Sequence, residues 1–270
     1  QYYVRNGYEQ MWDISEGRFL NETDGWKKVS IWGMGIASRD ITGDGRDEVV
    51  LTSMGDQLLQ MANEDGSYTN APFTTGTYAH RPYFGDDGRP STGWHAQFGD
   101  VDNDGLADLF ISKGNVDQMP SNAIHDPNNL LIQQANGTFV EAGLTSGVAS
   151  GERSRGAAVV DFDLDGRLDI LVLNRRAPME IYRNETQNTG HWLGVKLIQD
   201  GGNLNAIGAR VTVGQDIQQL YIGGGHAGGQ AVPLHFGLGS STEVSITVEW
   251  PDGSVNVHRA KADQTVVLLR

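Results

Sequence analysis

Three segments of the chain place oxygen-bearing side chains at the spacing that a hard metal ion requires. They start at Asp40, Asp100 and Asp161, so the starts lie 60 and 61 residues apart. Side chains at positions 1, 3, 5 and 9 of such a loop surround one ion, the backbone carbonyl of position 7 adds an oxygen, and glycine at position 6 permits the sharp turn. Oxygen donors alone favour Ca²⁺ over Zn²⁺ or Cu²⁺. The predicted ligands are Asp40, Thr42, Asp44, Arg46 and Glu48; Asp100, Asp102, Asp104, Leu106 and Asp108; and Asp161, Asp163, Asp165, Arg167 and Asp169, with Arg46, Leu106 and Arg167 acting through their carbonyls.

These loops predict about three bound calcium ions with a structural role. Position 12, where an EF-hand has a bidentate glutamate, is Leu51, Ile111 or Val172, so the chain has already entered a strand. Crowded carboxylates without an ion would repel one another or take up protons. The first loop fits less well, because Thr42 replaces Asp and Glu48 is longer. An acidic turn on a solvated surface is the alternative for any single loop, but three loops in register favour calcium.

The elements that must position the loops repeat with them. A β-rich run follows each loop, as at Val49–Leu51, and a second motif with a Gly-x-aromatic step comes next, as at Leu58–Asn63 and Gly66–Tyr68. Short strands separated by turns at this period are typical of propeller blades. From residue 188 onward the acidic loops stop, and alternating strands predict a small β-sandwich or barrel. The chain is therefore predicted to be all-β.

Composition excludes several classes of function. Thirty-four acidic and 20 basic residues give a net charge of −14, which argues against nucleic acid as a partner. No stretch approaches the ~20 apolar residues of a spanning helix, so membrane insertion is not expected. The absence of cysteine removes disulfides, thiolate catalysis and cysteine-based zinc sites. We assign no catalytic residue, because no His-x-x-x-His pair, Gly-x-Ser-x-Gly elbow or phosphate loop occurs. The segment Gly223–Gly229 is predicted to form a hairpin, with a backbone anion nest as the alternative.

The loops and their companion motifs resemble the FG-GAP/VCBS repeats of integrin α-chain propellers and many bacterial exported proteins. The C-terminal part resembles the ASPIC/UnbV domain, which follows such repeats in the cartilage acidic protein family. This resemblance implies a calcium requirement and assigns no activity. We expect a partial β-propeller over residues 1–187 and a small β domain over residues 188–270. The C-terminal motifs that carry the resemblance are Trp192–Leu197, Asn205–Val211, His235–Gly239 and Val248–Gly253.

The leading functional hypothesis is a secreted, calcium-binding module, extracellular or periplasmic, that binds a protein or glycan at an outer surface. Calcium sites of extracellular modules fill at millimolar calcium. Closed propellers usually have four or more blades, so we expect either a fragment of a longer chain or open sheet edges covered by a partner or by a second copy. The less favoured alternative is an exported enzyme acting on polysaccharide or a small substrate, with His80, Arg81 and His95 in its pocket.

Overall fold

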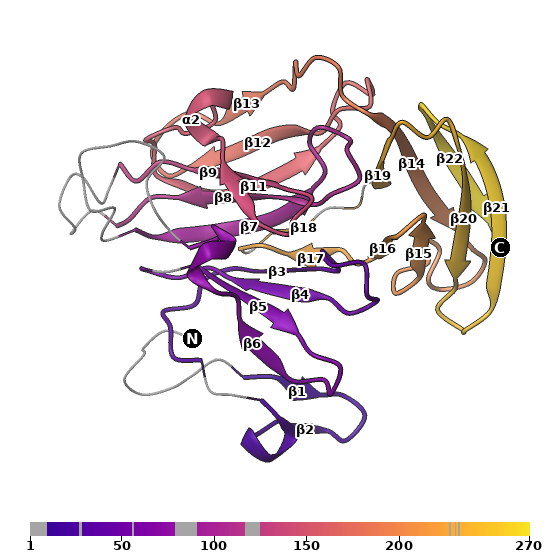
Figure 1. The fold of residues 1–270 in the computed structure, drawn as a ribbon, viewed down its shortest axis with the longest axis horizontal. Coiled ribbons are helices and arrows are strands. Elements are labelled where there is room, and N and C mark those ends of the chain that lie inside the picture. The colour runs from indigo at the N-terminus through magenta and orange to yellow at the C-terminus, as the bar shows by residue number, and fades with distance from the viewer. Residues whose placement is uncertain are drawn as a thin grey trace.

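The computed structural model describes residues 10–26, 29–55, 57–78, 91–116, 125–226, 228–229, 231 and 233–270. Within them the protein is nearly all-β, and its helical turns are short: η1 (Glu22–Asp24), η2 (Phe73–Thr75) and α2 (Gly143–Ser146) (Figure 1). The strands are β1 (Trp12–Asp13), β2 (Arg18–Phe19), β3 (Ile36–Arg39), β4 (Glu48–Leu51), β5 (Leu58–Ala62), β6 (Tyr68–Asn70), β7 (Gly93–Gly99), β8 (Asp108–Lys113), β9 (Asn129–Gln133), β10 (Phe139–Glu141), β11 (Ser154–Val160), β12 (Asp169–Asn174), β13 (Glu180–Tyr182), β14 (His191–Ile198), β15 (Arg210–Val213), β16 (Asp216–Gln219), β17 (Gly223–Gly224), β18 (Gly228–Gly229), β19 (Leu234–Gly239), β20 (Glu243–Glu249), β21 (Val255–Lys261) and β22 (Gln264–Leu269).

Three antiparallel sheets follow one another along the chain as propeller blades. Blade one has the order β3-β4-β5-β6, blade two the order β10-β9-β8-β7, and blade three the order β11-β12-β13. The three acidic loops join β3 to β4, β7 to β8 and β11 to β12, so each occupies the same place in its blade. A short hairpin, β1-β2, precedes blade one. Among the described residues the blades form an open array, which confirms the predicted all-β partial propeller.

Large apolar side chains between neighbouring blades hold the array together. Leu59 of blade one packs in one cluster with Leu109 of blade two, and Phe110 on the other face of β8 packs in a second cluster with Val172 of blade three. All four side chains are at most 2% exposed. Burying a side chain of this size stabilises a fold by about 1.5–3 kcal/mol. The alternation of Leu109 and Phe110 along β8 therefore lets blade two bury both of its faces.

The C-terminal part is a β-sandwich of two sheets. The first has the order β19-β14-β22, with β14 and β22 parallel, and the second has the order β16-β15-β20-β21. Their facing side chains form one cluster that includes Leu193 and Phe236 from the first sheet and Val211 and Ile246 from the second. All four are fully buried. This confirms the predicted small β domain, while the boundary between residues 187 and 188 remains a prediction.

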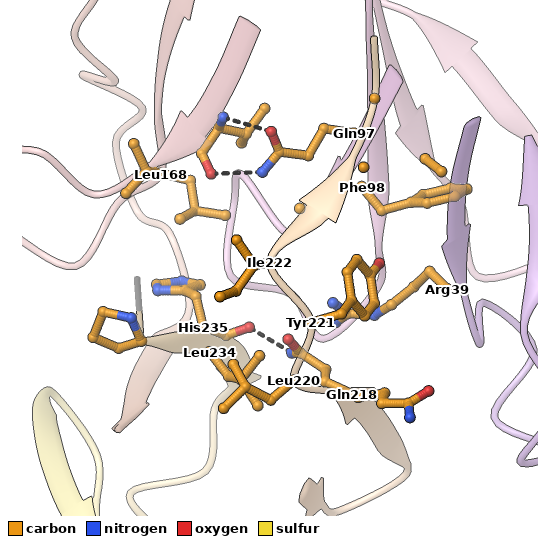
Figure 2. Close-up of a pocket in the computed structure, with 18 of the residues that line it drawn as sticks. Arg39, Gln97, Phe98, Leu168, Gln218, Leu220, Tyr221, Ile222, Leu234 and His235 are labelled. Carbon is orange, nitrogen blue, oxygen red and sulfur yellow. Dashed lines mark hydrogen bonds between the residues drawn. The ribbon is translucent and has the colours of Figure 1, made fainter. Parts of the chain in front are cut away.

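The glycine-rich segment forms the hairpin β17-β18 and docks on the inner strand of blade one (Figure 1). The Gly225 N–H donates to the Ile36 carbonyl at 2.8 Å, and the Ile36 N–H donates back at 3.1 Å. Gly225 has a φ of +62°, and a Cβ there would lie 2.1 Å from the His95 ring. Only glycine fits this position. A cavity of about 310 Å³ lies beside the hairpin, between the blades and the sandwich (Figure 2).

Candidate metal centres

The three acidic loops share one pattern of internal hydrogen bonds. The first carboxylate of each loop accepts the backbone N–H groups of positions 5 and 6, as Asp100 does from Asp104 at 3.1 Å and from Gly105 at 2.7 Å. The last carboxylate accepts the N–H of position 2, as Asp108 does from Val101 at 2.9 Å. Position 6 is a glycine with a φ of +86°, +93° or +87° in the three loops. The sequence spacing thus reproduces the same loop three times.

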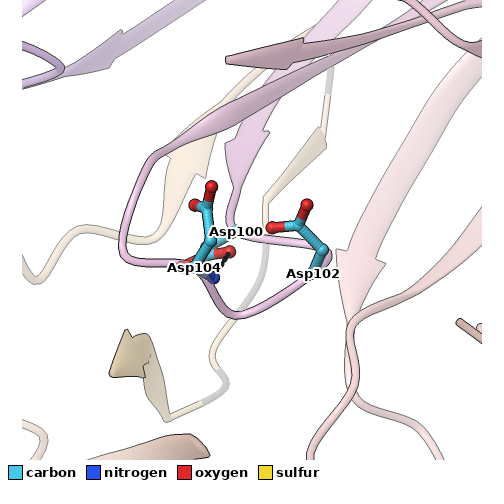
Figure 3. A group of neighbouring side chains, drawn as sticks. All are labelled: Asp100, Asp102 and Asp104. Atoms are coloured by element: carbon cyan, nitrogen blue, oxygen red, sulfur yellow. Dashed lines mark hydrogen bonds between the residues drawn. The ribbon is translucent and has the colours of Figure 1, made fainter. Parts of the chain in front are cut away.

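The second loop gathers carboxylates in a partly buried space. Asp100, Asp102 and Asp104 each offer an oxygen, and these oxygens lie within 4.8 Å of one another (Figure 3). Burial raises the pKa of Asp100 to about 7 and that of Asp108 to about 8. The buried Asp102 Oδ1 has no hydrogen-bond partner among the described residues. Desolvated carboxylates with an unsatisfied oxygen fit a divalent cation, which would supply the missing charge and the missing contact.

The third loop has a similar cluster of three carboxylates, from Asp161, Asp163 and Asp169. Two arginines reach its acidic side chains. Arg183 Nε lies 2.7 Å from Asp163 Oδ2, and Arg167 pairs with Asp165. The Arg183 side chain is 58% exposed, so we expect it to move aside at little cost. The residues present therefore fit a cation here as well.

The first loop is different, because Thr42 at position 3 provides a hydroxyl in place of a carboxylate. Glu48 at position 9 is fully buried, and its Oε1 atom has no hydrogen-bond partner within the described part of the chain. Burial raises the pKa of Glu48 to about 7. Asp44 pairs with Arg46 at 2.5 Å. The buried glutamate fits a cation, while the smaller number of carboxylates predicts weaker binding than in the other loops.

The sandwich packs against the second loop, and sequence reasoning did not foresee this contact. Asn103, at position 4 of that loop, donates from Nδ2 to the Gly166 carbonyl at 2.9 Å, so its Oδ1 accepts from His235 Nε2 at 2.7 Å. Loss of hydration lowers the pKa of His235 to about 4, which keeps the ring neutral. The Gly237 backbone lies so close to Asp100 that a Cβ there would be 1.8 Å from Asp100 Oδ2. The sandwich therefore forms one wall of the second site.

The other two loops also contact the sandwich. Arg210 Nη2 donates to the Gly45 carbonyl of the first loop at 3.0 Å. In the third loop a Cβ on Gly166 would lie 1.9 Å from Trp192 Nε1, so the indole rests on this glycine. An ion pair of Arg39 with Asp216, at 2.8 Å, supports the same junction. All three candidate metal loops thus lie at the interface between the blades and the sandwich.

Of the three residues of the enzyme alternative, the structure describes His95, which lines the cavity beside the glycine hairpin. His80 and Arg81 lie outside the described residues. His95 is 4% exposed, and burial lowers its pKa. Its Nδ1 atom faces the His226 N–H at 3.3 Å, and its ring lies against Gly225. In the structure His95 supports the docked glycine hairpin.

Among the described residues no helix is long and apolar enough to cross a membrane. A family model described as FG-GAP-like repeat matches residues 40–111 and 100–172, and one described as ASPIC and UnbV matches residues 199–270. Two solved structures share low similarity with the chain. The Dos1 propeller has a TM-score of 0.37 at 10% identity over 95% of this chain and 65% of its own. An exo-β-1,3-galactanase from Phanerochaete chrysosporium has a TM-score of 0.32 at 8% identity over 94% and 54%.

Curated relatives match in sequence. Cartilage acidic protein 1 of Homo sapiens is 29% identical over 168 residues, 58% of this chain and 24% of the relative. The Mus musculus protein is 27% identical over 56% of this chain, and the Xenopus tropicalis protein is 31% identical over 38%. The match spans only 17–24% of the length of these relatives. From the two family models, the chain belongs to the FG-GAP-like repeat proteins that carry a C-terminal ASPIC and UnbV domain.

Proposed function

We propose that the protein is a calcium-binding recognition module that works outside the cell or in the periplasm. The observation that carries this proposal is the set of three equivalent acidic loops, two of which contain a buried carboxylate oxygen without a hydrogen-bond partner among the described residues. FG-GAP-like repeats and relatives named cartilage acidic protein 1 support the same conclusion. Extracellular calcium modules bind with Kd of about 10⁻⁴–10⁻³ M, which suits the calcium concentration outside cells.

The ions would be held by the side chains at positions 1, 3, 5 and 9 of each loop and by the carbonyl of position 7. When bound, each calcium ion supplies positive charge that offsets carboxylate repulsion. The protein supplies the turn, through glycine at position 6, and fixes the first and last carboxylates with backbone N–H groups. In the second loop the sandwich closes the site from the outside through Gly237. The metal role we propose is structural: it ties the loops to the blades and the blades to the sandwich.

Equilibrium dialysis against radioactive calcium tests the metal assignment. We expect three ions per chain, and two ions for the Asp102→Asn variant, because a carboxylate at position 3 is lost from the second loop. The control is Asp200→Asn, since Asp200 is an exposed carboxylate on a turn of the sandwich and should leave the count at three. A count of zero at millimolar calcium, or a count that Asp102→Asn does not change, would contradict the proposal.

The partner surface we propose is the open side of blade three. Ala158, Leu171 and Ile181 lie opposite one another across the three strands. Leu173 on the same face is 50% exposed and Ile181 is 59% exposed. An exposed apolar face on an open sheet favours association with a further protein surface. We propose that a protein partner, in the simplest case a second copy of the chain, covers this face.

Sedimentation velocity in calcium, over a range of concentrations, tests self-association. We expect the wild-type chain to sediment above its monomer mass of 29.3 kDa and the Leu173→Glu variant to sediment as a monomer, because a charge on this face opposes burial. Val140→Glu is the control, since Val140 is 53% exposed on β10 of blade two and should leave the wild-type behaviour intact. A wild-type monomer at every concentration would exclude the second copy as the partner.

A further inference from the structure

The junction cavity, defined as the space between β3, β7 and β11 of the blades and the segments 217–225 and 233–235 of the sandwich, has the size of a ligand site. Its volume is about 310 Å³, which lies at the lower end of the 300–1,000 Å³ that small-molecule sites occupy, and such sites are frequent at domain interfaces. Both parts of the protein contribute its walls (Figure 2). The third acidic loop borders the cavity, because Asp161 and Leu164 are among its lining residues.

The walls of the junction cavity are mainly apolar. Inner strands contribute small residues, such as Ala37 and Ala96, that leave room near the centre of the array. Figure 2 shows larger apolar side chains from both parts of the protein around the same space. These larger side chains are Phe98, Val159, Leu168, Leu220, Ile222 and Leu234.

Several polar side chains of the walls are already bonded within the protein. Gln97 donates to the Val159 carbonyl and accepts from the Val159 N–H, both at 3.0 Å. The Tyr221 hydroxyl donates to the Ser38 carbonyl at 2.9 Å. Arg39 Nη2 pairs with Asp216, while the buried Arg39 Nε has no hydrogen-bond partner among the described residues. The mainly apolar walls, together with these bonded groups, disfavour a glycan in this cavity.

Several apolar side chains on the walls are nevertheless exposed. Ile222 is 42% exposed and Tyr221 is 45% exposed, although both lie between two packed domains. Leu164, at position 4 of the third acidic loop, also lines the cavity and is 79% exposed. Its φ is +61°, a left-handed conformation that is costly for leucine.

The other acidic loops show what the fold requires at position 4. They have Gly43 with a φ of +74° and Asn103 with a φ of +60°, the two residue types that adopt this conformation most easily. Leucine at the third loop therefore carries a backbone strain that glycine and asparagine largely avoid in the other loops. Strain of this kind is found where a residue serves binding. The strained Leu164 side chain lines the junction cavity.

We propose that the junction cavity binds a small, neutral, apolar molecule, aromatic or aliphatic, and that Leu164 and Ile222 form part of its contact surface. The ligand would cover side chains that otherwise face water, and it would contact the blades and the sandwich at once. This site goes beyond the proposed calcium and partner functions, because its proposed contact residues Leu164 and Ile222 are not predicted metal ligands and do not belong to the open face of blade three, although Asp161 of the third loop also lines the cavity.

Titration of the calcium-loaded full chain with the neutral fluorescent probe N-phenyl-1-naphthylamine tests the inference. We expect saturable binding of one probe per chain, with enhanced and blue-shifted emission. The Leu164→Asn variant should bind about tenfold more weakly, because an apolar contact is lost, while its melting temperature stays equal or rises through relief of the strained backbone. The matched control is Leu204→Asn, since Leu204 is 60% exposed and lies away from the cavity.

A second variant, at a residue outside the third acidic loop, tests the same cavity. Ile222→Asn should also weaken probe binding about tenfold, with calcium stoichiometry unchanged for both cavity variants. The inference is overturned if the wild-type chain shows no saturable binding, or if Leu204→Asn weakens binding as much as the cavity variants do. It is also overturned if galactose or glucose displaces the probe at concentrations where neutral aromatic competitors do not.

Discussion

Chelation of calcium with EGTA is expected to lower the melting temperature of the protein by about 10–20 °C. In calcium at about 10–100 mM, a hundred times the Kd of about 10⁻⁴–10⁻³ M that extracellular modules have, each filled site stabilises the folded state by about 2.7 kcal/mol. Two filled sites then contribute about 5 kcal/mol, and in a chain of this size each kcal/mol shifts the melting temperature by about 2–4 °C. The physical source is the acidic loops, where burial raises the pKa of Asp100 to about 7 and of Asp108 to about 8. Differential scanning calorimetry with calcium and with EGTA measures the shift.

A magnesium control tests whether any divalent cation can replace calcium in the loops. Magnesium added in excess over EGTA should recover only a small part of the shift, because Mg²⁺ demands a compact octahedral shell and keeps its water. The Asp102→Asn variant should show a smaller difference between calcium and EGTA than the wild-type chain, because one site is lost. A melting temperature that does not respond to chelation would refute the metal assignment for all three loops.

Much of the fold could be predicted because it is encoded locally. An acidic loop of nine residues is defined by its own spacing, so the segments at Asp40, Asp100 and Asp161 could be aligned without any tertiary information. The strands that follow them have the apolar runs of buried strands. In the second and third loops the structure gathers three of the four carboxylates of each loop within 4.8 Å of one another. In the first loop it shows a buried, unpartnered Glu48 oxygen in place of a cluster among the described residues.

The contacts between distant segments could not be predicted in the same way. Asn103 and His235 are 132 residues apart in sequence, and nothing local indicates that they form a hydrogen bond. Likewise, no pattern shows that a glycine hairpin will cover His95, so that residue was considered for a catalytic pocket. One signal was available: position 4 of the loops reads Gly43, Asn103 and Leu164, and the leucine stands out once the loops are aligned.

These contacts change what the metal does. A calcium ion bound in the second loop would fix Asp100, and Asp100 lies against the backbone of β19 in the sandwich. Fixing the loop therefore also fixes the surface on which the sandwich docks. Coupling of this kind is reciprocal, because a docked sandwich holds the loop in the shape that binds the ion. We therefore expect changes on the sandwich side of the interface to alter calcium binding.

The Gly237→Ala variant tests this coupling and should have a large effect. A Cβ on Gly237 would lie 1.8 Å from Asp100 Oδ2 and 2.7 Å from the Asn103 Cα. The carboxylate could swing away, but the Cα belongs to the backbone, so β19 and the loop must separate. Such overpacking costs about 1–3 kcal/mol, which lowers the melting temperature by about 2–12 °C. Equilibrium dialysis should also show two ions per chain in place of three, although no ligand has been changed.

The matched control is Gly202→Ala, on a turn of the sandwich where an added Cβ meets no atom within 4 Å. This variant should keep the wild-type melting temperature and calcium count. If Gly237→Ala behaves like the control, β19 does not contact the second loop in solution and the sandwich is not a wall of that site. If Gly237→Ala loses stability equally with calcium and with EGTA and still binds three ions, the contact serves packing alone. Loss of one ion together with loss of stability is the result that the geometry predicts.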